Sequence, residues 1–277
     1  MLTNSITLLK DARAHAQCIP AFNIYNLETA QAAFQAARLA QKPVIAAFGE
    51  GYQENASLLV IAAIVKTLAG QHPYPVVLHL DHCKEIDTIY RAIDAGFTSV
   101  MYDGSRLPLK DNIANTLRVV QYAHERGVGV EGELGCMNPE DGSEMPDSIS
   151  HSAYTDVNQA RRYAKETGVD SLAGAVGNAH GLYKGTPHLH MERLEEIYRA
   201  VEIPLVLHGC SGIPAGQIRQ AVSIAVAKIN VNTELALAGS NQIAALLREK
   251  ETMRLEKLML GARERMAEVM KSFFDFA

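Results

Sequence analysis

The sequence predicts a single (β/α)8 barrel domain over residues 1–277, with an extra helix before the barrel and an amphipathic helix after it. Eight short apolar segments recur along the chain, and stretches with helical spacing separate them. Few polar residues interrupt these segments, which is typical of parallel strands buried on both faces. Eight such repeats in 277 residues suit a closed barrel better than an open sheet. No stretch rich in Pro, Gly or Ser divides the chain, so one domain is expected.

The elements follow in order along the chain. The expected strands cover residues 20–24, 43–48, 75–80, 98–102, 128–134, 170–176, 204–208 and 226–231. The expected helices between them cover residues 27–41, 55–69, 86–95, 113–126, 158–167, 191–201 and 214–222, and another begins at Glu234. Residues 3–16 are expected to form a helix that closes the bottom of the barrel. The long irregular segment 135–152 is of a length that usually serves function or moves.

The last expected helix, residues 252–274, carries an apolar stripe with charges opposite. The stripe consists of Met259, Ala262, Met266, Val269, Met270 and Phe273. Its spacing predicts an amphipathic helix that packs on the barrel wall or on a second subunit, rather than on a membrane.

Composition excludes several functional classes. The chain has 26 Lys+Arg against 31 Asp+Glu, a net charge of −5, so the basic excess typical of nucleic-acid binding is missing. No apolar run approaches the ~18 residues of a membrane span, and the first residues do not resemble a secretory signal. The 4 cysteines form no CxxC pair. We therefore expect a reduced, cytoplasmic protein without disulfides.

Three histidines lie at the same end of the predicted barrel, where such barrels carry their catalytic groups. His82 directly follows the third expected strand, His180 follows the sixth, and His208 ends the seventh. Three imidazoles with an open fourth position form a catalytic zinc site if they converge in space. His79 shares a strand face with Asp81 and is expected to hold that carboxylate.

The other histidines have weaker claims to a functional role. His151 lies in the long loop and is a minor candidate for approaching the site. Surface positions are expected for His15, His72, His124, His188 and His190.

Glycine-bearing segments follow the last two expected strands, at residues 209–212 and 230–233. Loops at these positions of a barrel bind phosphate through backbone N–H groups and a helix N-terminus. Ser211 and Thr233 add hydroxyl groups, and Thr233 is placed to cap the helix that begins at Glu234.

Carboxylates form a third candidate set. Asp81 lies beside the first histidine of the rim, and Asp103 follows the fourth expected strand. Glu131 and Glu133 share one face of the fifth strand. Burying them unpaired is costly. A metal or proton-transfer role is therefore reasonable, and Glu131 can equally accept a hydrogen bond from a metal-bound histidine. Glu140, in the long loop, is by default a solvated charge.

Zinc, a phosphate pocket and a nearby carboxylic acid suit one chemistry. A metal polarises the carbonyl of a phosphorylated ketone, and a carboxylate exchanges the proton on the oxygen of the aldehyde partner. The reaction is reversible aldol cleavage.

Four motifs carry a resemblance to the class II, zinc-dependent ketose-bisphosphate aldolases, which include fructose- and tagatose-bisphosphate aldolases and fold as TIM barrels. The motifs are HLDHC (79–83), GNAHGLYKG (177–185), LHGCSGIP (207–214) and KINVNTE (228–234). The resemblance covers most of the chain, from PAFNI at its start.

The resemblance implies roles for individual residues. It implies Zn2+ ligands at His82, His180 and His208, a proton-donating Asp81, and Glu140 as the match for a carbon-acid base. It implies glycerone-phosphate contacts at Gly181, Gly209, Cys210, Ser211, Asn230, Val231, Asn232 and Thr233. A monovalent cation, Na+ or K+, would be held by backbone at Ala179, Gly181, Gly209 and Ser211. Asp103 and Glu133 match carboxylates that hold the metal in an alternate position.

Two departures concern the substrate. The glycine pair that usually follows the strand-five motif is missing around Gly135, and the C-terminal segment lacks the Asp-Pro-Arg element. Candidate cations for a distal phosphate are Arg106, Lys184, Arg254, Arg263 and Arg265. We expect a ketose 1,6-bisphosphate substrate of the fructose or tagatose type, with a ketose 1-phosphate or a modified sugar phosphate as the alternative.

The remaining expectations concern assembly and rival functions. A homodimer or homotetramer is expected, with a stabilising partner subunit as an additional possibility and no nucleic-acid or membrane partner. A barrel-type zinc hydrolase would use the same ligands but would not need phosphate loops. The chain could also be a stabilising partner subunit of an aldolase, although such a protein should lack the three histidines and Asp81.

Overall fold

Eight parallel strands close into a barrel in sequence order, with β1 paired to both β2 and β8. The computed structural model describes residues 1–135, 154–181, 183, 185–250 and 252–277. The strands are β1 (Ile19–Asn23), β2 (Val44–Gly49), β3 (Val76–Cys83), β4 (Ser99–Tyr102), β5 (Gly129–Leu134), β6 (Ser171–Gly174), β7 (Leu205–Leu207) and β8 (Val226–Val231). Each overlaps an expected strand, and the predicted (β/α)8 barrel is confirmed.

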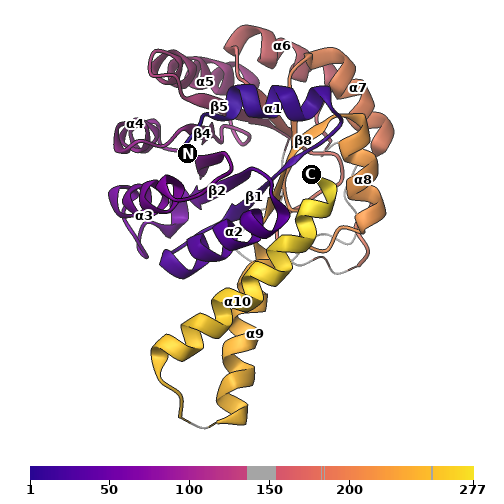
Figure 1. Cartoon of the computed structure of the whole chain (residues 1–277). Coiled ribbons are helices and arrows are strands. Elements are labelled where there is room, and N and C mark those ends of the chain that lie inside the picture. The colour runs from indigo at the N-terminus through magenta and orange to yellow at the C-terminus, as the bar shows by residue number, and fades with distance from the viewer. Residues whose placement is uncertain (136–153, 182, 184, 251) are drawn as a thin grey trace.

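Helices surround the barrel (Figure 1). Those that follow strands are α2 (Leu27–Ala40), α3 (Leu58–Gly70), α4 (Ile86–Ala95), α5 (Leu109–His124), α6 (Val157–Thr167), α7 (Met191–Val201), α8 (Ala215–Ile224) and α9 (Thr233–Glu249). Local chemistry decides where they begin. The Ser57 side chain accepts a hydrogen bond from the N–H of Val60, so α3 begins at Leu58, three residues after the expected start.

The N-terminal helix α1 (Ser5–Ala14) closes one end of the barrel, as expected. Leu9 and Ala12 are buried in one cluster with Ile45 and Val77, which point into the lumen from β2 and β3. A separate, larger cluster packs the outward faces of the strands against the helices. Apolar side chains therefore fill the end of the barrel that α1 covers. The opposite rim, at the carboxyl ends of the strands, is left for polar side chains.

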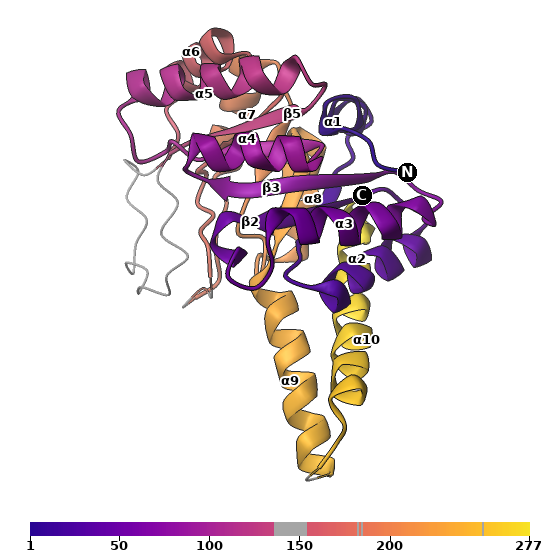
Figure 2. The ribbon, with the colours of Figure 1, turned by 90° about the vertical axis from the view of Figure 1, so that its left-hand side faces the viewer.

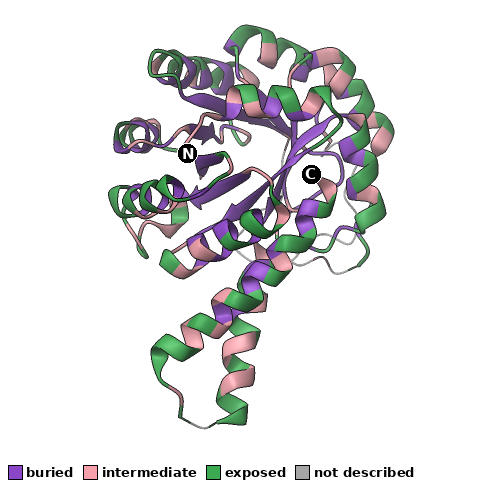
Figure 3. Cartoon of the chain, in the orientation of Figure 1, coloured by how far each residue is buried: buried purple, intermediate pink, exposed green. Residues whose placement is uncertain are grey.

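The helices α9 and α10 (Leu255–Phe273) form a hairpin that projects from the barrel wall (Figures 1 and 2). The predicted stripe packs inward, with Ala262, Met266, Met270 and Phe273 buried. Phe22 of β1 meets the Phe273 ring edge to face at 6.3 Å. Toward its tip the hairpin is largely exposed (Figure 3). Packing on the barrel wall is thus confirmed. Among the described residues, none of the helices combines the length and the apolar character that a membrane span requires.

Truncating Met270 to alanine is expected to lower the free energy of unfolding by about 2–5 kcal/mol, because its fully buried side chain would leave a cavity between α10 and the barrel. Leu255→Ala is the matched control, since Leu255 is 71% exposed and should cost less than about 0.5 kcal/mol. Urea unfolding of both variants measures the difference. Equal costs would contradict this account of the stripe.

One histidine was placed wrongly by the sequence. His72 was expected at the surface, but it is only 6% exposed and its Nε2 lies 3.0 Å from the carbonyl oxygen of Phe34. Its ring also meets the Phe34 ring edge to face. A connecting loop can bury a histidine when backbone carbonyls satisfy its ring nitrogens, and periodicity does not reveal this.

Candidate active site and metal centre

The end of β3 presents two adjacent polar residues to the same site. Val77, His79 and Asp81 alternate along the strand, and Val77 lies in the lumen cluster. His82 would then point outward. It has φ 47°, and the pairing of β3 with β4 shifts between Leu80 and Cys83. The left-handed backbone conformation of His82 brings its ring to the rim beside Asp81. Such a conformation strains the backbone of a non-glycine residue, and strained residues of this kind are common at functional sites.

The three predicted metal ligands converge. His82 Nε2 lies 2.8 Å from His208 Nδ1, and the His82 and His180 rings are 4.6 Å apart between centroids. One ring nitrogen from each histidine lies within 4.8 Å of the others. Burial, and then the neighbouring His82, lowers the pKa of His180 and of His208, so both rings are neutral and can donate a lone pair. These residues fit a tetrahedral metal site with one open position.

A buried carboxylate orients one of these histidines. His208 Nε2 lies 2.8 Å from Glu131 Oε1, which leaves Nδ1 to face the site. Lys228 Nζ donates to Glu131 Oε2 at 2.7 Å and lies 3.2 Å from His79 Nε2. Burial alone would raise the pKa of Glu131, but Lys228 and His208 outweigh it and keep the carboxyl ionised. Of the two roles left open for Glu131, the geometry favours the hydrogen-bond acceptor.

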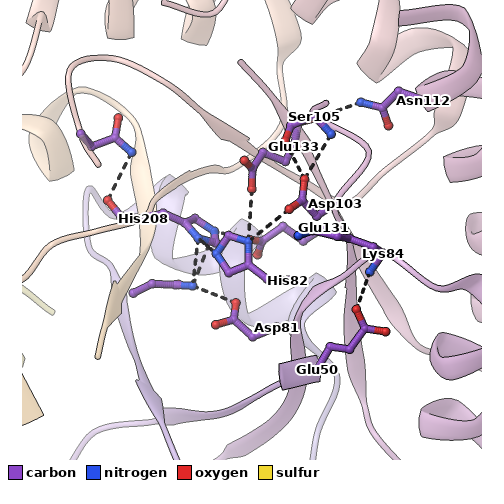
Figure 4. A network of polar contacts seen from close by, with 12 residues as sticks. Glu50, Asp81, His82, Lys84, Asp103, Ser105, Asn112, Glu131, Glu133 and His208 are labelled. Carbon is purple, nitrogen blue, oxygen red and sulfur yellow. Dashed lines mark hydrogen bonds and ion pairs between the residues drawn. The ribbon is translucent and has the colours of Figure 1, made fainter. Parts of the chain in front are cut away.

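A second donor set lies behind His82 (Figure 4). His82 Nδ1 is 3.6 Å from Glu133 Oε2 and 3.7 Å from Asp103 Oδ2. Burial raises the pKa of Glu133 to about 8, and the negative charge of Asp103 adds to the effect. Among the described residues Glu133 Oε2 has no hydrogen-bond partner although it is buried. An orphaned carboxylate oxygen here fits the predicted alternate metal position, and these three side chains form a possible ligand group.

Two amides hold Asp81. Asn23 Nδ2 donates to Oδ2 at 3.0 Å, and Asn230 Nδ2 donates to Oδ1 at 3.1 Å. Burial would raise the pKa of Asp81, but the positive charges of His82 and Lys228 lower it well below its usual range. The carboxyl is therefore ionised.

His79 does not hold Asp81 as expected. Its Nε2 is 3.8 Å from Asp81 Oδ1, while its Nδ1 lies 2.8 Å from Ser99 Oγ. Sequence reasoning also missed Asn23 as the partner. Its position at the carboxyl end of the first apolar run was an available signal, and the same rule that selected the histidines applies to it.

The three histidines, Asp81 and Asn23 line a pocket of about 180 Å³ at the rim of the barrel. Its walls are Asn23, Tyr52, Asp81, His82, His180, Gly181, His208, Gly209, Ser211, Asn230, Asn232 and Thr233. In the part of the chain that the structure describes, no lysine or arginine lines this pocket. The side chains of Cys210 and Val231 do not line it but are buried in the larger cluster between strands and helices, and the Cys210 N–H donates to the carbonyl of Asn230 at 3.1 Å.

Ser211 joins the two glycine-bearing loops. Its hydroxyl accepts a hydrogen bond from the N–H of Glu234 at 3.2 Å, in the first turn of α9. Thr233 is therefore not the cap that the sequence predicted. The helix begins at Thr233 itself, and the hydroxyl that reaches its first turn comes from the preceding strand–helix loop.

The residues expected to hold a monovalent cation lie in close backbone contact. A Cβ on Gly209, which has φ 64°, would sit 2.0 Å from the carbonyl oxygen of Ala179, so only glycine fits. The Tyr183 hydroxyl accepts from the Ala179 N–H at 2.9 Å and donates to the Gly209 carbonyl at 3.0 Å. The cation itself stays a prediction.

The remaining candidates fall into two groups. Glu140, His151 and Lys184 lie outside the described residues. Arg106 and Arg254 are exposed, and Arg265 pairs with Glu268 at 2.8 Å. Arg263 lies 3.4 Å from Gln31 on α2. None of the described arginines named for a distal phosphate lines the pocket.

The chain is similar to known proteins over nearly its whole length. The family described as "Fructose-bisphosphate aldolase class-II" matches residues 3–277. A 6-phospho-5-dehydro-2-deoxy-D-gluconate aldolase of Bacillus licheniformis is 42% identical over 250 residues, covering 87% of this chain and 82% of the relative. A fructose-bisphosphate aldolase of Staphylococcus aureus is 40% identical over 270 residues, covering 95% and 93%. The crystal structure of the YdjI aldolase from Escherichia coli K12 superposes with a TM-score of 0.88 at 33% identity, covering 100% and 97%.

Proposed function

The chain belongs to the class II fructose-bisphosphate aldolase family and is a lyase, and on that basis we propose that it uses zinc to cleave a ketose phosphate reversibly into glycerone phosphate and an aldehyde. One observation carries the proposal. Three histidines, an ionised aspartate and two glycine-bearing loops line a single pocket. Nothing in a zinc hydrolase requires the two loops, and a non-catalytic partner subunit requires neither the histidines nor Asp81.

The chemistry divides among the residues of the pocket. His82, His180 and His208 would hold the metal, which when bound supplies a positive charge that polarises the ketone carbonyl. Asp81 accepts the proton of the substrate hydroxyl as the carbon–carbon bond breaks, and returns it in the reverse reaction. The loops after β7 and β8 bind the phosphate beside the ketone through backbone N–H groups and the start of α9.

The pocket offers fewer contacts for the aldehyde end of the substrate, which is distal to the ketone. A second phosphate needs a cation, usually arginine. The described pocket offers none, which favours the sequence-based alternative, a substrate with one phosphate at the ketone end, over the bisphosphate. The name of the Bacillus licheniformis relative also supports a substrate with one phosphate, because it specifies a single phosphate and a carboxylic acid.

The proposal is tested with zinc-loaded protein. We expect it to exchange a carbon-bound hydrogen of glycerone phosphate for deuterium in D2O and to condense glycerone phosphate with an aldehyde from a panel, and we expect a chelator to stop both reactions. If zinc-loaded protein does neither, the proposed function is wrong. Comparison of kcat/KM for fructose 1,6-bisphosphate, tagatose 1,6-bisphosphate and fructose 1-phosphate then shows whether the enzyme recognises a second phosphate at the aldehyde end of the substrate. Comparable values for the monophosphate favour a single phosphate, and a preference of about 10²-fold for a bisphosphate restores the first choice.

A further inference from the structure

Two tyrosines that follow β1 and β2, the strands next to β8 in the closed barrel, hold the loop after β8. Asn232 Nδ2 donates to the Tyr52 hydroxyl at 2.8 Å, and the Tyr25 hydroxyl donates to Asn232 Oδ1. The two tyrosine rings meet edge to face at 4.7 Å between centroids. Tyr25 follows β1 and Tyr52 follows β2, so residues far apart in the chain converge on one asparagine.

The Tyr52 ring reaches this position because Gly49, the last residue of β2, has no side chain. A Cβ at Gly49 would lie 2.9 Å from Cε2 of the Tyr52 ring. The short helix η1 (Glu50–Tyr52) that carries the tyrosine is tied to the end of β3. Glu50 accepts a hydrogen bond from the Lys84 N–H at 3.0 Å (Figure 4). It accepts a second one from Cys83 Sγ at 3.2 Å. The tyrosine is thus held on both sides.

Asn232 is the residue immediately before α9, a position at which asparagine is among the strongest caps. Its side chain makes no capping bond to α9, every residue of which the structure describes. The tyrosines engage both polar ends of that side chain instead. The first turn of α9 therefore has no cap from Asn232, although Ser211 from the loop after β7 accepts its Glu234 N–H. Thr233, the first residue of α9, lines the pocket, and a helix N-terminus favours an anion.

We propose that Tyr25 and Tyr52 are positioning residues that divert the Asn232 side chain from α9 and fix the start of that helix for the substrate phosphate. The inference rests on the proposed function, because it assumes that this loop binds the phosphate beside the ketone. The pair acts through Asn232 and the backbone that follows it. It should therefore govern phosphate affinity and leave the metal site unchanged.

The experiment measures the affinity of the zinc-loaded protein for glycerone phosphate by titration calorimetry. Tyr52→Phe and Tyr25→Phe each remove one hydroxyl and keep the ring, and each is expected to raise Kd about fivefold to tenfold. Gly49→Ala should have the same effect by displacing the Tyr52 ring. Tyr122→Phe is the matched control, since the Tyr122 hydroxyl, like that of Tyr25, donates a hydrogen bond to a side-chain oxygen, here that of Asp94 on the surface. In turnover, KM for a cleaved substrate should rise while kcat stays within about twofold.

The outcomes separate the two proposals. Unchanged Kd in both tyrosine variants, or a loss of bound zinc in either, overturns the positioning role. A fall in kcat with unchanged KM overturns it as well. Weaker binding in the variants of a protein that cleaves no sugar phosphate supports the positioning role and overturns the proposed function alone. Failure of the wild-type protein to bind glycerone phosphate overturns both.

Discussion

Replacing His180 by alanine is expected to remove bound zinc and to lower kcat/KM for aldol cleavage by roughly 10³-fold. The structure brings one nitrogen each from His82, His180 and His208 within 4.8 Å. Losing one of three protein ligands weakens the site, and a metal supplies several kcal/mol of charge stabilisation in the transition state. Metal analysis of the purified variant and a coupled assay for glycerone phosphate measure the two effects separately.

His15→Ala is the control for this experiment, because the His15 side chain is 64% exposed and distant from the pocket in the fold. It should retain both zinc and activity. Full activity of the zinc-stripped wild-type protein would contradict the interpretation that a metal is required.

A Schiff base is then the competing mechanism, and Lys228 is the lysine nearest the histidines along β8. Its ammonium group is buried and engaged by Glu131 at 2.7 Å, so borohydride with substrate should trap no adduct.

Replacing Asp81 by alanine is expected to abolish most carbon–carbon cleavage while sparing the earlier steps. The carboxylate is held by amides of Asn23 and Asn230 beside the three histidines, and Asp81 does not belong to either candidate metal-binding group of the described residues. General acid–base help of this kind is worth about 10²–10⁴-fold. We therefore expect a loss of at least about 10²-fold in cleavage, measured in the coupled assay.

The partial reaction supplies the control for Asp81. Asp81→Ala should bind zinc and glycerone phosphate and should still exchange deuterium into glycerone phosphate, since that exchange involves no aldehyde oxygen. Cleavage at the wild-type rate would exclude the proton-transfer role. Loss of zinc would instead assign Asp81 to the metal shell.

The sequence was sufficient to predict the barrel and the three histidines that converge at its rim. Each strand is a short apolar run set by local side-chain preference, and eight of them in one chain leave few arrangements other than closure. Because the carboxyl ends of all eight strands meet at one rim, the position of His82, His180 and His208 after their strands was enough to predict that they converge. The structure confirms this convergence.

The sequence was less informative wherever a side chain's role depends on what faces it. Local pattern placed His72 at the surface and gave Thr233 the capping role, and both expectations were wrong because the partners come from elsewhere in the chain. Ser211 reaches the first turn of α9 from the loop after β7. His79 bonds to Ser99 of the neighbouring strand rather than to Asp81.

What the sequence determined by itself is therefore the set of elements and the end of the barrel at which the chemistry lies. Only the tertiary structure decided how those residues work together. Strand alternation would have turned His82 away from Asp81, and the left-handed backbone at His82 reverses this. Likewise, Tyr25 and Tyr52 meet Asn232 only after the barrel closes β8 against β1. Periodicity records which face a residue occupies, whereas hydrogen bonds and metal ligation depend on distances between atoms far apart in the chain, and folding alone sets these distances.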